Sequence, residues 1–398
     1  MTAPNESTAS AFPTSPIVDH VPGASATVED APLSTAWHYG DPLVEQQRVE
    51  SGTPGLVDHW DRVPILVSGA EAKGWLNDLI SQKVNAIAEG QATHGLILDG
   101  QGRVLHHFGI AALPSGLLLD VASEHADELQ NYLQKMVFWA QVKVERLDMG
   151  LVGVLRKTRT PRANEAGEGA PEDLGDLPIH SWRVTHLGEM EELGLWIPRA
   201  NFADSWDKLI HLTGARPTGA MAWNAWRILA RKVDVLQDLD SRVIPHEVPE
   251  FVGPANHAAT QLGSVSDGPS AHAVHLNKGC YRGQETVSRV QNLGKSPRVL
   301  VLLHIDGSAQ KLPAVDSELL ADGRTIGRVG SSVHDATYGP IALALVKRNL
   351  VEKIARAGSG APSLTADGVD AAIDPDDLKV DDTARPGREA IRKLRGHP

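Results

Sequence analysis

The chain has 398 residues, of which 41% are hydrophobic and 22% charged, so it is long enough for more than one domain. Acidic residues outnumber basic ones by 50 to 38, and the formal charge of −12 argues against broad affinity for nucleic acid. No stretch approaches the roughly 18 consecutive apolar residues of a membrane span, and the Ser/Thr/Pro/Ala-rich first 32 residues have neither a basic start nor an apolar run. We therefore expect a cytoplasmic protein with no direct contact to membrane or nucleic acid.

Three segments have the composition of flexible chain. Residues 1–32 and 157–178 contain too few aromatic and branched side chains to offset their ordering entropy, and the second is predicted to be an insertion. Residues 356–398 carry an acidic block followed by a basic one, which is typical of a solvated tail. The ordered part of the chain is therefore predicted between residues 33 and 355.

The first half of this region alternates between strand and helix patterns. In chain order, the predicted elements are a strand at 63–67, a helix at 72–80, a hairpin at 95–98 and 103–108, a strand at 117–121 and a helix at 124–136. Ser68 and Glu71 form a possible capping box for the first helix, and Ser123 can cap the second. The hairpin is predicted because Asp99-Gly100-Gln101-Gly102 supplies positive φ between its strands. This order predicts an α+β layer.

The second half changes character at Arg298. Helical periodicity is present at 202–212 and 220–229, whereas short strand patterns follow at 299–305, 318–320, 325–329 and 341–346. We predict a small all-β module at residues 298–355.

The segment richest in specific chemistry is residues 277–285, which contains Cys280, the only cysteine. Gly279 and Gly283 would let backbone approach a ligand closely, while Lys278 and Arg282 would favour the thiolate. The alternative interpretation is a small buried residue in a glycine-rich turn.

A metal site is also conceivable from the spacing of His272, His275 and Cys280, since imidazole and thiolate are natural zinc and iron ligands. There is no fourth donor, so ordinary loop histidines are the preferred interpretation. His106 and His107 are adjacent in a strand and should point to opposite faces. We predict no metal site.

Arg227 lies on a predicted helix beside Trp223 and Trp226, which could wall a planar ligand while the guanidinium binds a carboxylate. The same pattern fits a core helix with a surface arginine. Glu247 and Glu250 lie in a stiff proline-containing loop that is equally compatible with a turn.

Residues Lys278–Glu285 match the Lys-Gly-Cys-Tyr/Phe-x-Gly-Gln-Glu signature of the YgfZ family, folate-binding relatives of the glycine-cleavage T-protein, an aminomethyltransferase. The chain resembles this family over about residues 33–350, including Leu98-Asp99-Gly100-Gln101-Gly102-Arg103-Val104. The resemblance implies a T-protein-like, multi-part folate-binding domain at 33–297 and a carboxy-terminal β-barrel domain at 298–355.

The resemblance also implies site roles. Lys278 and Cys280 would be the catalytic residues of the signature, and tetrahydrofolate or a one-carbon derivative would be the cofactor. The predicted cofactor-binding residues are Arg227, Glu247, Tyr281, Gln284 and Glu285. Aminomethyltransferases carry an aspartate pair where this chain has His106 and His107, which argues against aminomethyl transfer.

The leading hypothesis is therefore a folate-binding accessory protein for iron–sulfur cluster assembly or repair, with iron–sulfur client enzymes or assembly factors as partners and tRNA-modifying enzymes among the clients. In it Cys280 is redox-active or transiently ligating. The alternative is a tetrahydrofolate-dependent one-carbon transferase or demethylase. A third interpretation is a folate-holding module whose cysteine is structural.

Overall fold

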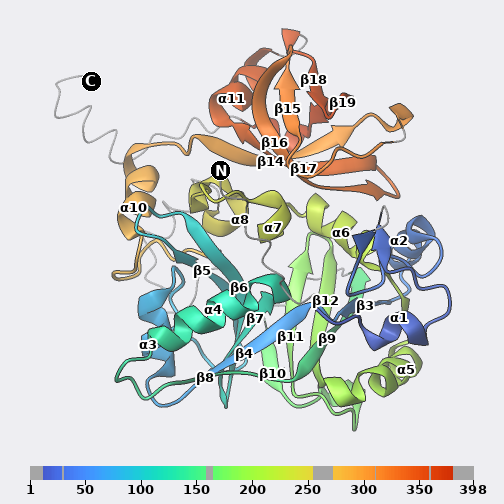
Figure 1. The fold of residues 1–398 in the computed structure, drawn as a ribbon, viewed down its shortest axis with the longest axis vertical. Coiled ribbons are helices and arrows are strands. Elements are labelled where there is room, and N and C mark those ends of the chain that lie inside the picture. Colours follow the sequence, from blue (N-terminus) through green and yellow to red (C-terminus); the bar gives the residue numbers. More distant parts are fainter. Residues whose placement is uncertain are drawn as a thin grey trace, which may run out of the picture.

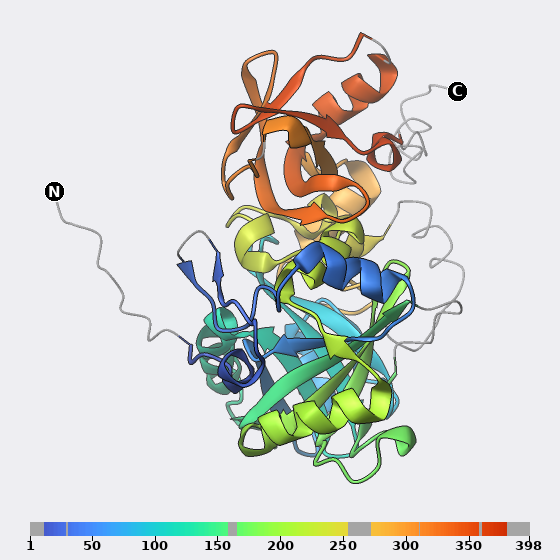
Figure 2. The same cartoon turned by 90° about the vertical axis from the view of Figure 1, so that its right-hand side faces the viewer.

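The computed structural model describes residues 12–28, 31–157, 165–253, 272–309, 311–357 and 360–379. Figure 1 shows two sheets in the lower part of the molecule and a closed barrel above them. Two short helices, α7 (Val235–Asp238) and α8 (Pro249–Val252), lie between the barrel and the sheets in both views (Figures 1 and 2). Among the described residues, no helix is long and apolar enough to cross a membrane.

The first sheet has five antiparallel strands in the order β5-β6-β7-β4-β8. They are β4 (Arg62–Ser68), β5 (Ala92–Leu98), β6 (Val104–Leu113), β7 (Gly116–Ala122) and β8 (Lys143–Arg146). Helices α3 (Ala72–Leu79) and α4 (Ser123–Lys135) bury Leu76, Leu129 and Leu133 against one face. Because successive strand residues point to opposite faces, β6 directs Phe108 into this core and His107 to the other side.

The second sheet has six strands in the order β10-β11-β12-β9-β3-β13. They are β3 (Gly55–His59), β9 (Met149–Lys157), β10 (Ala166–Glu168), β11 (Ser181–Leu187), β12 (Met190–Pro198) and β13 (Arg216–Pro217). Helix α5 (Phe202–Thr213) buries Phe202 and Trp206 against one face. Helices α2 (Pro42–Glu50) and α6 (Ala220–Leu229) cover the other, around Trp226. The amino-terminal elements are α1 (Pro16–His20), β1 (Thr27–Val28) and β2 (Ala31–Pro32).

The carboxy-terminal module is a closed barrel in the order β14-β17-β16-β15-β18-β19. Its strands are β14 (Arg298–Ile305), β15 (Glu318–Ala321), β16 (Arg324–Asp335), β17 (Gly339–Lys347), β18 (Leu364–Ala366) and β19 (Val369–Ile373). Helix α10 (Gln284–Leu293) precedes the barrel and α11 (Arg348–Ala357) follows β17. Leu303, Leu319 and Val346 are fully buried inside it. The predicted α+β fold with a carboxy-terminal barrel is confirmed.

Most local predictions are confirmed, with two exceptions at helix caps. The hairpin joins β5 and β6 as expected, with Asp99 accepting hydrogen bonds from the backbone N–H groups of Gln101 and Arg103. The predicted capping box is wrong because the Glu71 side chain makes no cap bond and accepts from the N–H of Gln141 instead. Ser123 is the first residue of α4 rather than its cap.

The segments predicted to be flexible contain ordered structure. In the first, Ser15 caps α1 and Ile17 is fully buried. The predicted insertion contributes β10, which pairs with β11, and the predicted tail contributes β18 and β19, which extend the barrel to Ile373. These short elements are stabilised by pairing with distant segments, which local composition does not reveal. Residues 1–11, 158–164 and 380–398 lie outside the described residues.

Candidate functional site

We call residues 277–285, which lead into α10, the signature loop. Within it Lys278 is buried, with 6% of its surface exposed. Its ammonium donates hydrogen bonds to three backbone carbonyls at the end of α3, those of Ile80 at 2.6 Å, Gln82 at 3.0 Å and Asn77. Burial lowers the pKa of Lys278 to about 8. The lysine thus fastens the signature loop to the carboxyl end of α3, where cations are favoured.

A second anchor joins the signature loop to the hairpin turn between β5 and β6. Gly283 has φ 83°, and a Cβ there would lie 2.7 Å from the Asp99 carbonyl oxygen and 2.9 Å from Gly102 Cα. The close approach predicted for Gly283 is therefore real, but its partner is the hairpin. A Cβ on Gly279 would meet nothing within 4 Å.

Cys280 is an exposed free thiol between the two anchors. Tyr281 is buried, its ring centre lies 5.2 Å from Lys278 Nζ, and burial raises its pKa. The Gln284 side-chain amide donates to the Lys278 carbonyl at 3.2 Å, and Glu285 is exposed in the first turn of α10. Tyr281 and Gln284 thus support the loop, whereas Cys280 and Glu285 face solvent. Folate contacts of Tyr281, Gln284 and Glu285 stay predictions.

Arg227 is occupied by intramolecular partners. It is 4% exposed and donates to Asp238 at 2.8 Å, to Ser331 at 2.7 Å, to the Lys232 carbonyl at 2.7 Å and to Asn224 at 2.8 Å. These contacts join α6 to α7 and to barrel strand β16. A carboxylate ligand would have to displace them, so the structure gives Arg227 a structural role between helix and barrel.

Glu247 is occupied in the same way. It is 1% exposed, and its carboxylate oxygens accept hydrogen bonds from Arg298 at 2.8 and 3.0 Å. Arg298, the first residue of β14, also pairs with Asp240. The predicted folate contacts Arg227 and Glu247 are therefore both engaged by partners within the chain. Both residues instead fix the barrel to the rest of the molecule.

A different set of polar side chains gathers at the face of β6 away from α4. His94 of β5 and His107 of β6 share a hydrogen bond of 2.9 Å, and the His107 ring centre lies 4.8 Å from that of Phe251 on α8. Lys232 and Glu250 form an ion pair of 2.8 Å. We call His94, His107, Lys232 and Glu250 the inner polar cluster.

The electrostatics of the inner polar cluster are coupled. Burial, together with His94, lowers the pKa of His107 to about 3. Burial would raise the pKa of Glu250, but Lys232 and the two histidines lower it to about 2. The second Glu250 oxygen, Oε2, is buried and has no hydrogen-bond partner. The cluster thus offers a negatively charged acceptor beside a lysine whose side chain is 30% exposed.

The two sheets are joined by another charged group. Asp120 of β7 pairs with Arg62 of β4 at 2.7 Å and with Arg183 of β11. Burial would raise the pKa of Asp120, but the two guanidinium groups lower it to about 2. A carboxylate is therefore present near β6, although it is paired with two arginines.

A recess of about 330 Å³ is lined by residues that include Arg146, Met149 and Arg199. None of the signature-loop residues, the inner polar cluster or Asp120 lines this recess.

Sequence reasoning missed these inner groups because their partners are far apart in the chain. Glu250 gave a weak signal, since it follows Pro249 in the acidic loop. Nothing in the pattern linked it to Lys232 or to His107. The prediction that His106 and His107 face different environments is confirmed, because His106 contacts His125 while His107 contacts Phe251.

The conceivable metal ligands before the signature loop differ in their contacts. The His272 ring lies 3.1 Å from the Glu250 carbonyl oxygen. The His275 backbone N–H donates to the Ser81 carbonyl, while Nδ1 of its ring is buried without a hydrogen-bond partner. Over the described residues, the group of histidine, cysteine and acidic side chains close enough to share an ion is elsewhere, at His106, His125 and Glu128.

No protein-family model matches the chain. It is 24% identical over 271 residues to the tRNA-modifying protein YgfZ of Colwellia psychrerythraea, covering 67% of this chain and 76% of the relative. It is 23% identical over 330 residues to the aminomethyltransferase of Thermotoga maritima, covering 78% of this chain and 83% of the relative. The crystal structure of the glycine cleavage system aminomethyltransferase T from Bartonella henselae has a TM-score of 0.68 at 16% identity, covering 91% of this chain and 96% of the other.

The chain therefore has the fold of the aminomethyltransferases and falls within the superfamily that contains them and the YgfZ proteins. The two kinds of relative match at nearly the same identity, so these comparisons do not choose between them. The resemblance stated from the sequence is thus confirmed for the superfamily. The narrower assignment depends on the chemistry of the site.

Proposed function

We propose that this protein binds a reduced folate and supports iron–sulfur cluster assembly or repair through the thiol of Cys280. The single observation that carries the proposal is the signature loop. It holds the whole Lys-Gly-Cys-Tyr-Arg-Gly-Gln-Glu motif, fastens it at Lys278 and Gly283, and leaves the only thiol exposed between them. One set of matching relatives carries the name tRNA-modifying protein YgfZ, which supports the same choice.

The inner polar cluster supports folate as the cofactor. A pterin presents N–H donors, and the unpartnered Oε2 of Glu250 is a buried acceptor. Lys232 pairs with Glu250 at 2.8 Å and lowers the pKa of that carboxyl group, so the acceptor stays ionised. We therefore assign the pterin contact to Glu250 Oε2, with Lys232 as the residue that positions this carboxylate, in place of the fully engaged Arg227 and Glu247. The bound folate would supply one-carbon or redox chemistry, while these side chains orient it.

The exposure of Cys280 supports a role toward another protein. A thiolate is the nucleophilic and metal-binding form of cysteine, and an exposed one can reach a partner's cluster or thiol. Iron–sulfur enzymes, including tRNA-modifying ones, or assembly factors are the partners that this chemistry fits.

The second candidate is a tetrahydrofolate-dependent one-carbon transferase, which the aminomethyltransferase relatives favour. Against it, β6 carries His106 and His107 and no carboxylate, and the inward His107 is hydrogen-bonded to His94. Incubation with tetrahydrofolate and methylamine donors should yield no one-carbon folate. Formation of such a product at a rate that falls in His107→Ala would favour the transferase.

Folate binding is tested by calorimetric titration of tetrahydrofolate and its formyl derivative. We expect binding to the wild type and to Cys280→Ala, and at least about tenfold weaker binding to Lys232→Met, because Glu250 would lose the cation that keeps its carboxylate ionised and in place. Lys295→Met is the matched control, because Lys295 pairs with Glu352 at 2.7 Å and its side chain is also 30% exposed. Equal binding by both lysine variants would contradict the assignment of the contact, and no binding to the wild type would contradict a folate role.

The thiol is tested in cells that lack the native protein. Activities of iron–sulfur enzymes should recover with the wild-type chain and with Ser288→Ala, but not with Cys280→Ala. Ser288 is an exposed residue of neighbouring α10, so its variant controls for surface changes near the loop. Full recovery with Cys280→Ala would refute the thiol-dependent role while leaving folate binding open.

A further inference from the structure

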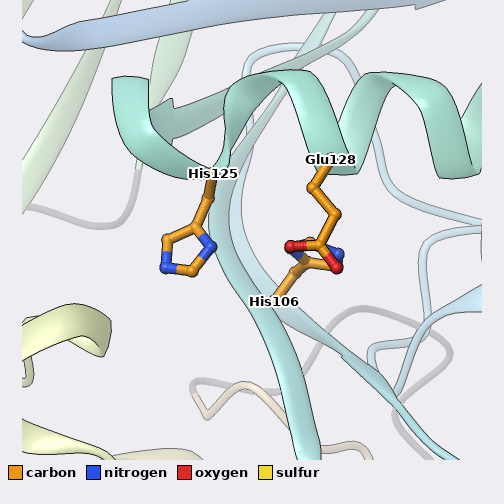
Figure 3. Close-up of side chains that lie close together, drawn as sticks. All are labelled: His106, His125 and Glu128. Atoms are coloured by element: carbon orange, nitrogen blue, oxygen red, sulfur yellow. The ribbon is translucent and has the colours of Figure 1, made fainter. Parts of the chain in front are cut away.

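Three potential metal ligands meet where α4 packs on β6. His106 comes from the strand, and His125 and Glu128 come from the first turns of the helix (Figure 3). Residues three apart on a helix lie on the same face. One donor atom from each of the three side chains lies within 4.8 Å of the other two.

One ring nitrogen of each histidine is buried without a hydrogen-bond partner. His106 is 2% exposed, and its Nδ1 is buried without a partner. His125 Nε2 is also buried and unpartnered. The rings meet edge to face, with centres 5.9 Å apart. Buried polar atoms in proteins are nearly always satisfied by a hydrogen bond, water or ion, so the orphaned nitrogen of the deeply buried His106, next to His125 and Glu128, points to a missing ligand.

We propose that His106, His125 and Glu128 form a binding site for one divalent transition-metal ion, with Zn²⁺ as the ion that best fits the donors. Two imidazoles and one carboxylate are a set of three protein ligands that leaves a fourth zinc position open. Tetrahedral coordination with bonds near 2.0–2.1 Å places donor atoms about 3.3 Å apart. The donor atoms lie within 4.8 Å of one another, so binding an ion requires them to move closer together. Glu128 is exposed, and its side chain can rotate to bring its carboxylate nearer to the histidines.

The proposed metal site is separate from the inner polar cluster. His106 and His107 are neighbours on β6 and point to opposite faces of the sheet. An ion at His106 would link strand β6 to helix α4, which contact one another here through side chains. The ion would lie on the opposite face of the sheet from Glu250, so we infer that it does not take part in folate binding.

The first test is titration of Zn²⁺ in the Cys280→Ser background, which removes the competing thiol. We expect one Zn²⁺ per chain, and Co²⁺ in its place should give the absorption bands of a tetrahedral site. Glu128→Gln and His125→Asn should each weaken Zn²⁺ binding by at least about tenfold. His211→Asn, at an exposed histidine of α5, should bind like the parent.

The variants affect exposed or half-buried positions, so they test the site without removing a core side chain. Zn²⁺ should also raise the melting temperature of the parent and not that of the His125→Asn/Glu128→Gln double variant. Unchanged Zn²⁺ stoichiometry and affinity in that double variant would overturn the proposal, as would the absence of binding to the parent.

Discussion

Replacing Lys278 by methionine tests whether this motif lysine acts as a structural anchor. Methionine retains the apolar stem of lysine as far as the ε position but removes the ammonium. The carbonyls of Asn77, Ile80 and Gln82 would then lose their shared donor. They lie at the end of α3, where helix carbonyls have no partner within the helix.

The magnitude follows from two opposing terms. A hydrogen bond to a charged group contributes about 1.5–3 kcal/mol, and three such bonds are lost. Burial lowers the pKa of Lys278 from 10.5 to about 8, which corresponds to a cost of about 3 kcal/mol for holding the charge inside. The net expectation is that Lys278→Met lowers the free energy of unfolding by about 1.5–6 kcal/mol.

Urea unfolding followed by tryptophan fluorescence measures this loss. Lys73→Met is the graded control, because Lys73 donates to a single carbonyl, that of Ile87 at 2.9 Å, and should cost about 1 kcal/mol. Lys278→Met should also speed alkylation of Cys280 by loosening the signature loop. An unfolding free energy within about 0.5 kcal/mol of wild type, well below the cost expected for lost charged hydrogen bonds, would refute the anchoring role and return Lys278 to the catalytic candidates.

Three further substitutions test other contacts. Burial raises the pKa of Asp58 from 3.8 to about 7, so the stabilising effect of its protonated form is complete below pH 3.8 and is lost as pH rises toward 7. In urea unfolding, the free energy of unfolding of Asp58→Asn should therefore rise relative to that of the wild type by about 2–3 kcal/mol as pH goes from 5 to 8. A difference that does not change with pH would contradict this. Gly283→Ala should lower the melting temperature, because its Cβ would meet the Asp99 carbonyl, whereas Gly279→Ala should leave it unchanged. Arg227→Ala should cost about 3–5 kcal/mol by leaving Asp238 buried without its ion-pair partner, and a smaller loss accompanied by weaker folate binding would restore the ligand role.

The elements that the sequence predicts correctly are those with a strong local signal. The turn at Asp99 to Gly102 and the apolar spacing of 220–229 each determine their structure almost alone. The last two barrel strands are short and lie in a segment of tail-like composition, so their formation depends on pairing with β14 and β15. Composition could not predict them, because the stabilising partner is elsewhere in the chain.

The same distinction explains the site. The motif residues Lys278 to Glu285 were found because they are contiguous. Arg227 and Glu247 have the right chemistry for a folate, but partners remote in sequence, Ser331 and Arg298, occupy them. The inner polar cluster and the proposed metal ligands are likewise assembled by sheet and helix packing, which no single-sequence spacing records.

Gln82 shows how the thiol and the proposed folate contact could act together although they lie on different elements. Its carbonyl accepts a hydrogen bond from Lys278, which anchors the loop that bears Cys280. Its side-chain amide donates to the carbonyls of His272 and His94, and the His272 ring in turn contacts the Glu250 carbonyl. A ligand that shifts Glu250 or His94 would therefore act on two of the hydrogen bonds of the Gln82 amide, which also donates to Thr93, and through its backbone on the anchor of the signature loop. This connection gives a folate-dependent change in the reactivity of Cys280 a physical route that needs no large movement of the two sheets.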